Sequence, residues 1–232
     1  MSMQTSVNIK SFSEDTRKSL LSTAGEVFAE FGFHAATVRE ICRRADVNVA
    51  AINYHFGSKE ELYLQVLESA HNEAARKYPY AASKDEPPEK RLEGFILSFM
   101  QGFLDKGRAS WHGKLMAREM VEPTVALKRM VERTIRPRNV FLTEAVREIM
   151  GGKFSDEEIA RSVFSIIGQC LFYSHASAVI ARLKPEINCG ADGAGQTASH
   201  IIRFSLAALK HMPLNKKGVT PFEGVTPFDG AK

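Results

Sequence analysis

Between Thr37 and Phe56 the chain reads TVREICRRADVNVAAINYHF, two short helical patterns separated by a polar turn. This spacing predicts a helix-turn-helix, a unit that sets its second helix into the major groove of DNA. A groove-reading helix needs small or polar exposed side chains so that its backbone can approach the base edges. The stretch 49–55 meets this need, because Ile52 and Phe56 lie four residues apart and share the inward face.

The remaining side chains of this unit suit the two kinds of contact that DNA offers. Asn53 carries the donor and acceptor pair that matches adenine, and the small side chains of Ala50 and Ala51 leave room for the bases. Polar groups near helix N-termini, where free amides bind phosphate, suit the backbone. The predicted DNA-binding residues are Thr37, Arg39, Val49, Ala50, Ala51, Asn53, Tyr54, His55 and Lys59.

Several helices must hold this unit in place. Apolar residues at steps of three and four predict a first helix from about Asp15 to Phe31, after a loose start, and Gly32 ends it. Two capping boxes, each a Ser or Thr followed three residues later by Glu, begin the helices after Thr37 and Ser58. Asn48 is the expected cap of the helix between them. The helix after Ser58 continues to about Lys77.

The prolines at 79, 87 and 88 indicate a joint between two regions. Beyond it the pattern predicts helices over about 89–104, 112–121, 124–150 with a kink at Pro137, 155–183 and 196–211. No stretch alternates as a strand does, so the predicted fold class is all-α. We expect a helix-turn-helix domain over 12–60, a connecting helix over 61–80, a larger helical effector-binding and dimerisation domain over 81–212, and a flexible tail over 213–232.

Composition excludes several classes of protein. The chain has 232 residues, 44% of them apolar and 25% charged, which is ordinary for a globular protein. No apolar run approaches the ~20 residues of a membrane span, and the N-terminus lacks a secretory signal. The three cysteines share no CxxC spacing, which indicates reduced thiols and a cytoplasmic location. In the first 60 residues seven basic side chains meet seven acidic ones, so DNA binding depends on where the charges point.

No pattern for catalysis or metal binding is present. The sequence lacks a nucleophile elbow, a P-loop and GxGxxG. His112 and His175 have no second ligand at a useful helical spacing, and His71 and Glu73 are two residues apart, which places them on different sides of a helix. We therefore expect no catalytic residue, no metal and no cofactor.

The stretch 16–67, with FAEFGFHAATVREICRRADVNVAAINYHFGSKEELY at its centre, resembles the DNA-binding domain of TetR-family transcriptional regulators. Asp46 stands where the family usually has glycine, and Asn53 stands where it most often has tyrosine. The later stretch GKLMAREMVEPTVALKRMVERTIRP resembles the subgroup with a CecR-type regulatory domain. The resemblance implies a homodimer on a palindromic operator, and repression relieved by an unknown small molecule bound in the C-terminal domain.

The aromatic and methionine residues of the C-terminal region are candidates for an effector cavity. Each alone is more typical of core packing, but together they can line a site for an apolar ligand, and methionines make such a wall adaptable. Gln169 and Tyr173 are candidate polar anchors. The predicted effector-binding residues are Phe99, Phe103, Trp111, Met116, Met120, Phe141, Gln169, Phe172 and Tyr173.

The last two long helical segments have wide apolar faces, and the resemblance implies a four-helix dimer bundle at this place. The predicted dimer residues are Ile159, Val163, Ile167, Cys170, Ser174, Ile201, Phe204 and Ala208. The favoured function is a dimeric, sequence-specific repressor released from DNA by a small molecule. An activator, or a regulator that answers to a protein partner, remains an alternative. So does a helical enzyme or binding module with a vestigial DNA-binding domain.

Overall fold

The computed structural model describes residues 2–79, 83–104, 111–187, 190 and 193–213, except the side chains of 2–13, 74, 75, 103 and 104. In this part of the chain every regular element is a helix, which confirms the all-α prediction. The elements are α1 (Ser2–Ala35), α2 (Val38–Ala45), α3 (Ala50–Phe56), α4 (Lys59–Lys77), α5 (Pro88–Leu104), α6 (Trp111–Val121), α7 (Ala126–Met130), η1 (Val131–Ile135), α8 (Arg136–Met150), α9 (Asp156–His175), α10 (Ser177–Leu183) and α11 (Ala194–His211).

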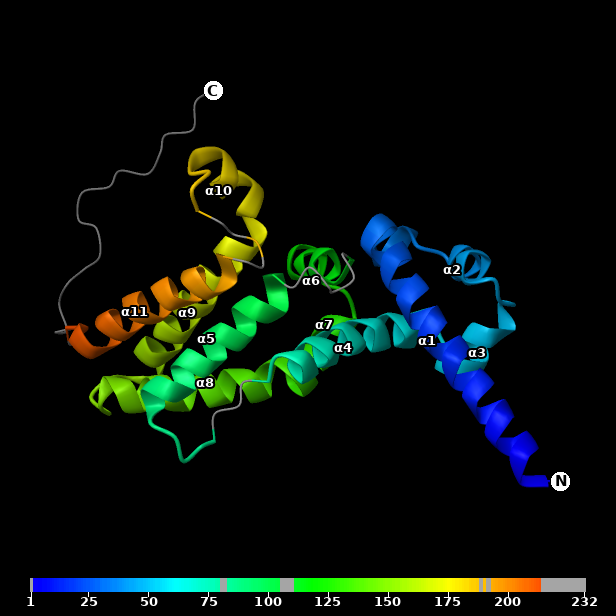
Figure 1. The fold of residues 1–232 in the computed structure, drawn as a ribbon, viewed down its shortest axis with the longest axis horizontal. Helices are drawn as coiled ribbons and strands as arrows, with labels where there is room; N and C mark the ends of the chain where they lie inside the picture. The colour runs from blue at the N-terminus through cyan, green and yellow to red at the C-terminus, as the bar shows by residue number, and fades with distance from the viewer. Residues whose placement is uncertain (1, 80–82, 105–110, 188–189, 191–192, 214–232) are drawn as a thin grey trace.

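The molecule is elongated, with α1, α2 and α3 at one end and a bundle of α5, α8, α9 and α11 at the other (Figure 1). Helix α4 runs from the first group toward the second, and α6 and α7 lie between them. The predicted tail over 213–232 falls almost wholly outside the described residues, as does Cys189. Within the described residues no single helix is both long and apolar enough to cross a bilayer. Helices α9 and α10 reach that length and apolar composition only when counted together, and they are bent by 74° relative to each other.

Helix α1 begins at Ser2, so the predicted loose start before Asp15 was wrong. Residues 2–13 carry no clear apolar stripe, but extending an existing helix avoids the cost of nucleation that a separate segment would meet. The predicted break at Gly32 is confirmed, because this residue has φ 77° and ψ 168° and interrupts the helix. The chain can thus turn into the helix-turn-helix at this point.

Two clusters of buried side chains form the interior. The first joins α1, α2, α3 and α4, and α6 and α7 complete it with Trp111, Leu115, Ala126 and Met130. The second lies among α5, α8, α9 and α11. The C-terminal region therefore contributes directly to the core beneath the DNA-binding helices.

The segment predicted as one kinked helix over 124–150 consists of three pieces. Helix α7 passes into the π-helical turn η1, and α8 begins at Arg136 with Pro137 in its first turn. Proline has no N–H to donate and its ring crowds the carbonyl four residues back, so the turn before it widens to i→i+5 hydrogen bonds. The backbone N–H of Arg136 accordingly donates to the carbonyl of Val131.

Helix α9 begins with a capping box of Ser155 and Glu158. It ends at His175, however, and α10 continues at an angle of 74° to it, so the predicted single helix to Leu183 was wrong. The bend lies at Ala176, a position that local helix propensity alone would not single out.

Candidate nucleic-acid interface

Local hydrogen bonds shape the turn between α2 and α3 as the sequence indicates. The Thr37 hydroxyl accepts from the backbone N–H of Glu40 at 3.1 Å and caps α2. Asp46 adopts the left-handed conformation, with φ 54° and ψ 46°, in which Asp is tolerated. Asn48 Oδ1 accepts from the N–H of Ala50 at 2.9 Å and so satisfies the first amide of α3, but the N-cap residue is Val49, one position later than predicted.

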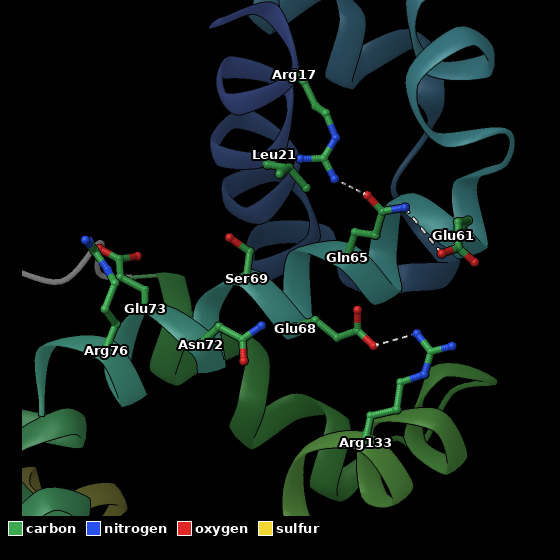
Figure 2. Close-up of a pocket in the computed structure, with 10 residues that line it drawn as sticks. All are labelled: Arg17, Leu21, Glu61, Gln65, Glu68, Ser69, Asn72, Glu73, Arg76 and Arg133. Atoms are coloured by element: carbon green, nitrogen blue, oxygen red, sulfur yellow. Dashed lines mark hydrogen bonds and ion pairs between the residues drawn. The ribbon is translucent and has the colours of Figure 1, made fainter. Parts of the chain in front are cut away.

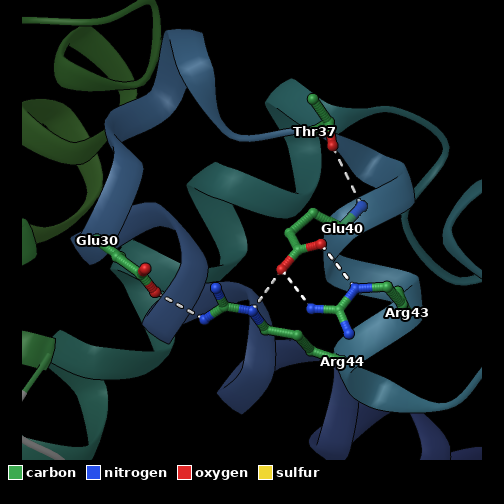
Figure 3. Close-up of polar contacts among 5 residues, drawn as sticks. All are labelled: Glu30, Thr37, Glu40, Arg43 and Arg44. Atoms are coloured by element: carbon green, nitrogen blue, oxygen red, sulfur yellow. Dashed lines mark hydrogen bonds and ion pairs between the residues drawn. The ribbon is translucent and has the colours of Figure 1, made fainter.

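The capping box predicted at Thr37 is only half formed, because the Glu40 carboxylate binds two arginines instead (Figure 3). It accepts from Arg43 at 2.8 Å and from Arg44 at 2.7 Å, and Arg44 also donates to Glu30 of α1 at 2.7 Å. The arginine hydrogen bonds lower the pKa of Glu40 to about 2. This network ties α2 to α1 and offsets the charge of two arginines.

The face of α3 that remains exposed is the one predicted to read bases. Ile52 and Phe56 are buried, as expected from their spacing. The Tyr54 side chain is 81% exposed, and Val49, Ala50 and Asn53 are also exposed, whereas Ala51 and His55 are half-buried. Arg39 of α2 is exposed and forms no ion pair among the described residues. These positions are compatible with DNA contact, and the individual roles stay predictions.

Lys59 has a structural contact that sequence reasoning missed. Its ammonium donates to the carbonyl of His34 at 3.3 Å and lies 4.8 Å from the centre of the Phe33 ring. The start of α4 is thereby tied to the end of α1. An ammonium has three donors, so one bond to His34 leaves others for the predicted phosphate contact.

Two family models cover most of the described chain. Residues 20–66 match bacterial regulatory proteins of the tetR family, and residues 88–209 match the C-terminal domain of the HTH-type transcriptional dual regulator CecR. The second match alone spans more than half of the 232 residues. The chain belongs to the TetR family of transcriptional regulators. Its C-terminal domain is of the CecR type, as the resemblance implied.

Individual relatives agree with this assignment. The CecR regulator of Shigella flexneri is 28% identical over 170 residues, which cover 69% of this chain and 76% of that protein. The hemolysin II regulator HlyIIR has the same fold, with a TM-score of 0.55 and 22% identity over 81% of this chain and 97% of that one. AibR, solved in complex with isovaleryl coenzyme A and operator DNA, gives a TM-score of 0.60 and 16% identity. This match covers 82% of this chain and 97% of that one. As a member of this family, the protein is a DNA-binding transcriptional regulator.

A mainly apolar cavity of about 190 Å³ lies inside this regulator where five helical elements and η1 meet. Three predicted effector residues line it, namely Phe99, Met116 and Met120. Sequence reasoning missed its other lining residues, which are His71, Phe95, Ser98, Gly102, Ile135, Arg138, Asn139, Ile167 and Leu171. His71 belongs to α4, so the predicted connecting helix itself forms part of the wall.

The other predicted effector residues whose side chains the structure describes do not line this cavity. Trp111 packs in the first core, Phe141 is buried in the second, and Tyr173 packs against the second. Phe172 is exposed, and Gln169 lines a separate groove between α9 and α11. The side chain of Phe103 is outside the described part of the structure. Helical spacing shows which residues share a face but not which helix covers it.

Helix α6 links the cavity to the DNA-binding helices, a role that the sequence did not indicate. Met116 and Met120 line the cavity, whereas the fully buried Glu119 accepts from the Tyr63 hydroxyl at 2.7 Å and from the Thr124 N–H at 2.9 Å. Burial, with the Glu119 carboxylate, raises the pKa of Tyr63 far above its usual range, so the hydroxyl keeps its proton and donates. The Tyr63 ring in turn packs edge-on against Phe28 of α1, with centroids 4.8 Å apart.

The contact between α6 and α1 is so close that it requires glycine. A Cβ atom on Gly25 would lie 2.4 Å from the Trp111 ring, and one on Gly32 would lie 2.6 Å from the Arg118 guanidinium. The indole at Gly25 is rigid and buried, so it cannot yield easily. Helix α6 is therefore in direct contact with α1 at these two glycines.

A polar cleft separates α1 and α4 from η1 on another side of the joint (Figure 2). Arg17 of α1 donates to Gln65 at 2.6 Å, and Gln65 donates to Glu61 at 3.3 Å. Across the cleft Arg133 binds Glu68 at 3.3 Å, and Arg129 binds Glu61 at 2.7 Å. These exposed pairs are individually weak, so they orient α4 without locking it.

The predicted dimer residues divide between the inside and the outside of the subunit. Ile159, Val163, Cys170 and Ile201 are buried in the second core, so their assignment to an interface surface is corrected. Ile167 lines the cavity, and Ser174 is half-buried. Phe204 and Ala208 are exposed, and α9 exposes Phe164 and Phe172. Burial also raises the pKa of the Cys170 thiol to about 12, which keeps it un-ionised.

The fold brings together one histidine and one carboxylate that are distant in sequence. His112, which is buried, lies 3.9 Å from a carboxylate oxygen of Glu73. Two groups do not make a metal site, and no cluster of three or more His, Cys, Asp or Glu occurs among the residues that the structure describes.

Proposed function

We propose that this regulator is a homodimeric repressor that leaves its palindromic operator when a small molecule fills the apolar cavity lined by α4, α5, α6, η1, α8 and α9, here called the α4–α9 cavity. The observation that carries the proposal is that α4 and α6 each contact both the cavity and the DNA-binding helices. Residues 12–60 then read DNA, 61–80 connect, 81–212 hold the effector and the dimer contacts, and 213–232 form a tail. We place the protein in the cytoplasm, where its DNA is.

The mechanism is a shift between two arrangements of the same dimer. In one, the two α3 helices lie about 34 Å apart, one turn of DNA, and both reach the major groove. A ligand that binds the other arrangement better draws the population toward it and lowers operator affinity by the ratio of its two affinities. A ligand that displaces His71, Met116 and Met120 would move α4 and α6. The helices against which α3 packs would then move as well.

The dimer would form through the outer faces of α9 and α11. Phe164, Phe172 and Phe204 are each 58–62% exposed in the isolated subunit, an unusual amount of aromatic surface for a monomer. An isologous contact of two such faces would make a four-helix bundle and would match the two-fold symmetry of the operator.

The decisive experiment selects the operator from random duplex DNA with the purified full chain. We expect enrichment of one palindromic sequence, and compounds that raise the melting temperature should weaken binding to that duplex at the same concentrations. Failure to enrich any sequence at low salt would overturn DNA reading. Stabilising compounds that leave operator affinity unchanged would overturn release by an effector.

Activation is a second candidate because the relative CecR is itself named a dual regulator. The DNA-binding step is the same, and only the operator position relative to the promoter differs. A reporter gene with the selected operator placed either upstream of a promoter or overlapping it distinguishes activation from repression. Increased transcription from the upstream site would favour activation.

A further inference from the structure

We infer that α3 reads A·T base pairs in each half of the operator, with an adenine bound by Asn53 and a thymine methyl group packed against Val49. The inference rests on the proposed function, because it names the class of DNA sequence that the same unit binds. It follows from the side chains on the exposed face of α3, from the partners of the nearby cations and from the chemistry of the base edges.

Four side chains share the exposed face at the start of α3. Val49, Ala50, Asn53 and Tyr54 are exposed, and steps of three and four residues place them on one side of the helix. The helix itself, AAINYHF, contains no Lys or Arg. Guanine is most often recognised in the major groove by Arg or Lys. Helix α3 therefore lacks the side chains that usually select G·C pairs.

His55 is the remaining polar side chain of α3 that could reach a base. It is half-buried, and its ring lies 4.9 Å from that of Tyr54 and 6.1 Å from that of Phe56, measured between centroids. Since Phe56 is buried, this contact draws His55 toward the inner side of the helix. The exposed face is thus left with one amide, one phenol and two apolar side chains.

The cations of α2 and of the start of α4 do not supply a guanine contact to α3. Arg43 donates from Nε and Nη2 to Glu40 at 2.8 Å, so the pair of donors that a guanine needs is already occupied. Arg44 binds Glu40 at 2.7 Å, and Lys59 is held against the end of α1. Arg39, in the first turn of α2, is exposed and forms no ion pair among the described residues. A guanine contact is therefore open to α2 but not to α3.

The Asn53 amide matches the edge of adenine. Adenine presents an N7 acceptor and an N6 amino donor in the major groove, and an Asn side chain binds both at once. The side chain of Asn53 is exposed and makes no hydrogen bond among the described residues, so both of its polar groups are available. Guanine presents two acceptors at the same positions, which would leave the Asn53 carbonyl without a donor.

The apolar part of the face matches thymine. Val49 is 44% exposed at the N-terminus of α3, and Ala50 beside it carries only a methyl group, so the backbone can approach the bases closely. Thymine is the base that presents a methyl group in the major groove, where apolar side chains contact it. Cytosine presents an amino group instead, and a valine would cover this donor without accepting from it. Both ends of the face therefore favour A·T pairs.

The adenine contact is tested on the operator selected with the full chain. Each adenine of one half-site is replaced in turn by 7-deazaadenine, which keeps its pairing but lacks the N7 acceptor. At one position or more the affinity, measured by fluorescence anisotropy, should fall about 5-fold through the loss of one hydrogen bond. Asn53→Ala should abolish this loss, and the comparison within one variant does not depend on its overall stability. Asn72→Ala, at an exposed position of α4, is the matched control and should retain the loss.

The thymine contact is tested in the same way with deoxyuridine, which lacks only the methyl group. Replacement of one thymine should lower the affinity about 4-fold, as expected for one buried methyl group. Val49→Ser should remove this preference and keep α3 intact, because serine is favoured at a helix N-cap. Val125→Ser is the matched control, since Val125 is also an exposed valine at the N-cap of a short helix, α7.

The selection is then repeated with Asn53→Ala and Val49→Ser, and the positions whose base preference changes are those that α3 reads. G·C pairs at these positions would overturn the inference, as would modified bases without effect throughout the half-site, or variants that keep the wild-type losses.

The inference and the proposed function fail in different ways. A selected palindrome with G·C pairs under α3 supports DNA reading and overturns only the inference. An operator with the expected A·T contacts that no stabilising compound releases supports the inference and contradicts release by an effector. Failure to select any sequence overturns both.

Discussion

Tyr54 and Glu40 illustrate how single residues in the DNA-binding unit divide their work between DNA and the protein itself. Tyr54 is nearly fully exposed and edge-on to His55, with ring centroids 4.9 Å apart, which leaves its hydroxyl toward solvent. Glu40, in contrast, is occupied by Arg43 and Arg44. The residues most available for DNA are thus those without partners inside the subunit.

Replacing Tyr54 by Phe should weaken binding to the selected operator by about 10-fold, since a hydrogen bond to a charged phosphate contributes about 1.5 kcal/mol. The melting temperature should not change, because the hydroxyl has no partner among the described residues. Fluorescence anisotropy titration measures the affinity. Tyr173→Phe, on α9 far along the chain, is the matched control, and an unchanged affinity for Tyr54→Phe would remove this residue from the contact set.

The Glu40 network predicts a dependence of stability on pH. The folded pKa of about 2 lies below the ordinary 4.5, so the stabilisation is fully present above pH 4.5 and is lost as the pH falls toward 2. The melting temperature of Glu40→Gln should therefore fall below that of the wild type near neutral pH, and the gap should narrow through this window. Thermal melts across the range, with the exposed Glu60→Gln as control, test this; a constant gap would contradict it.

At the scale of elements, α6 is the helix that contacts both the cavity and the core beneath the DNA-binding helices. One of its faces lines the cavity, and another carries Glu119 and Trp111 into the core beneath the DNA-binding helices. Helix α4 shares both regions through His71 and Tyr63. Under the proposed mechanism, a ligand in the cavity would contact both helices that pack against the DNA-binding unit, and the weak ion pairs of the polar cleft would permit their movement.

Gly25→Ala should destabilise the protein by about 1–3 kcal/mol, because the added methyl group overlaps the Trp111 ring and must push α6 away from α1. Differential scanning calorimetry should record a lower melting temperature, and operator affinity should fall with it. Gly113→Ala on the same α6 is the control, since open space surrounds it and alanine favours a helix by about 1 kcal/mol. Equal effects of the two substitutions would argue against a tight α1–α6 contact.

At the scale of the whole molecule, the exposed aromatic surface of α9 and α11 is the feature that a single subunit leaves unexplained. It lies at the end of the molecule away from α2 and α3, where a contact between copies would leave both recognition helices free (Figure 1). The spacing of those helices would then be set by the dimer and not by either subunit.

Phe204→Glu should convert the dimer to monomers, because two buried carboxylates would face each other across the two-fold axis without partners. Sedimentation velocity at micromolar concentration measures the assembly, and operator affinity should drop by 100-fold or more, about 2.7 kcal/mol, when half-sites bind separately. Val125→Glu, an exposed apolar position between α6 and α7, is the control. A dimer that survives Phe204→Glu would place the interface elsewhere.

The sequence by itself determined the helix-turn-helix, because its signals are local. The caps at Thr37, Asn48 and Ser58 act within three residues, and the positive φ at Gly32 and Asp46 follows from residue type. The inward positions Ile52 and Phe56 follow from helical period. All of these could be predicted, together with the all-α class and the family.

Only the tertiary structure decided which face of each C-terminal helix packs inward. Helices α9 and α11 are apolar around much of their circumference, so periodicity could not separate the buried Ile159 and Ile201 from the exposed Phe172 and Phe204. The same limit applies to Trp111 and Gln169, which do not line the cavity. The Tyr63–Glu119 bond spans 56 positions, and the cavity joins five helices, so no local pattern encodes either one. Contacts between distant segments depend on packing, which is a property of the folded chain.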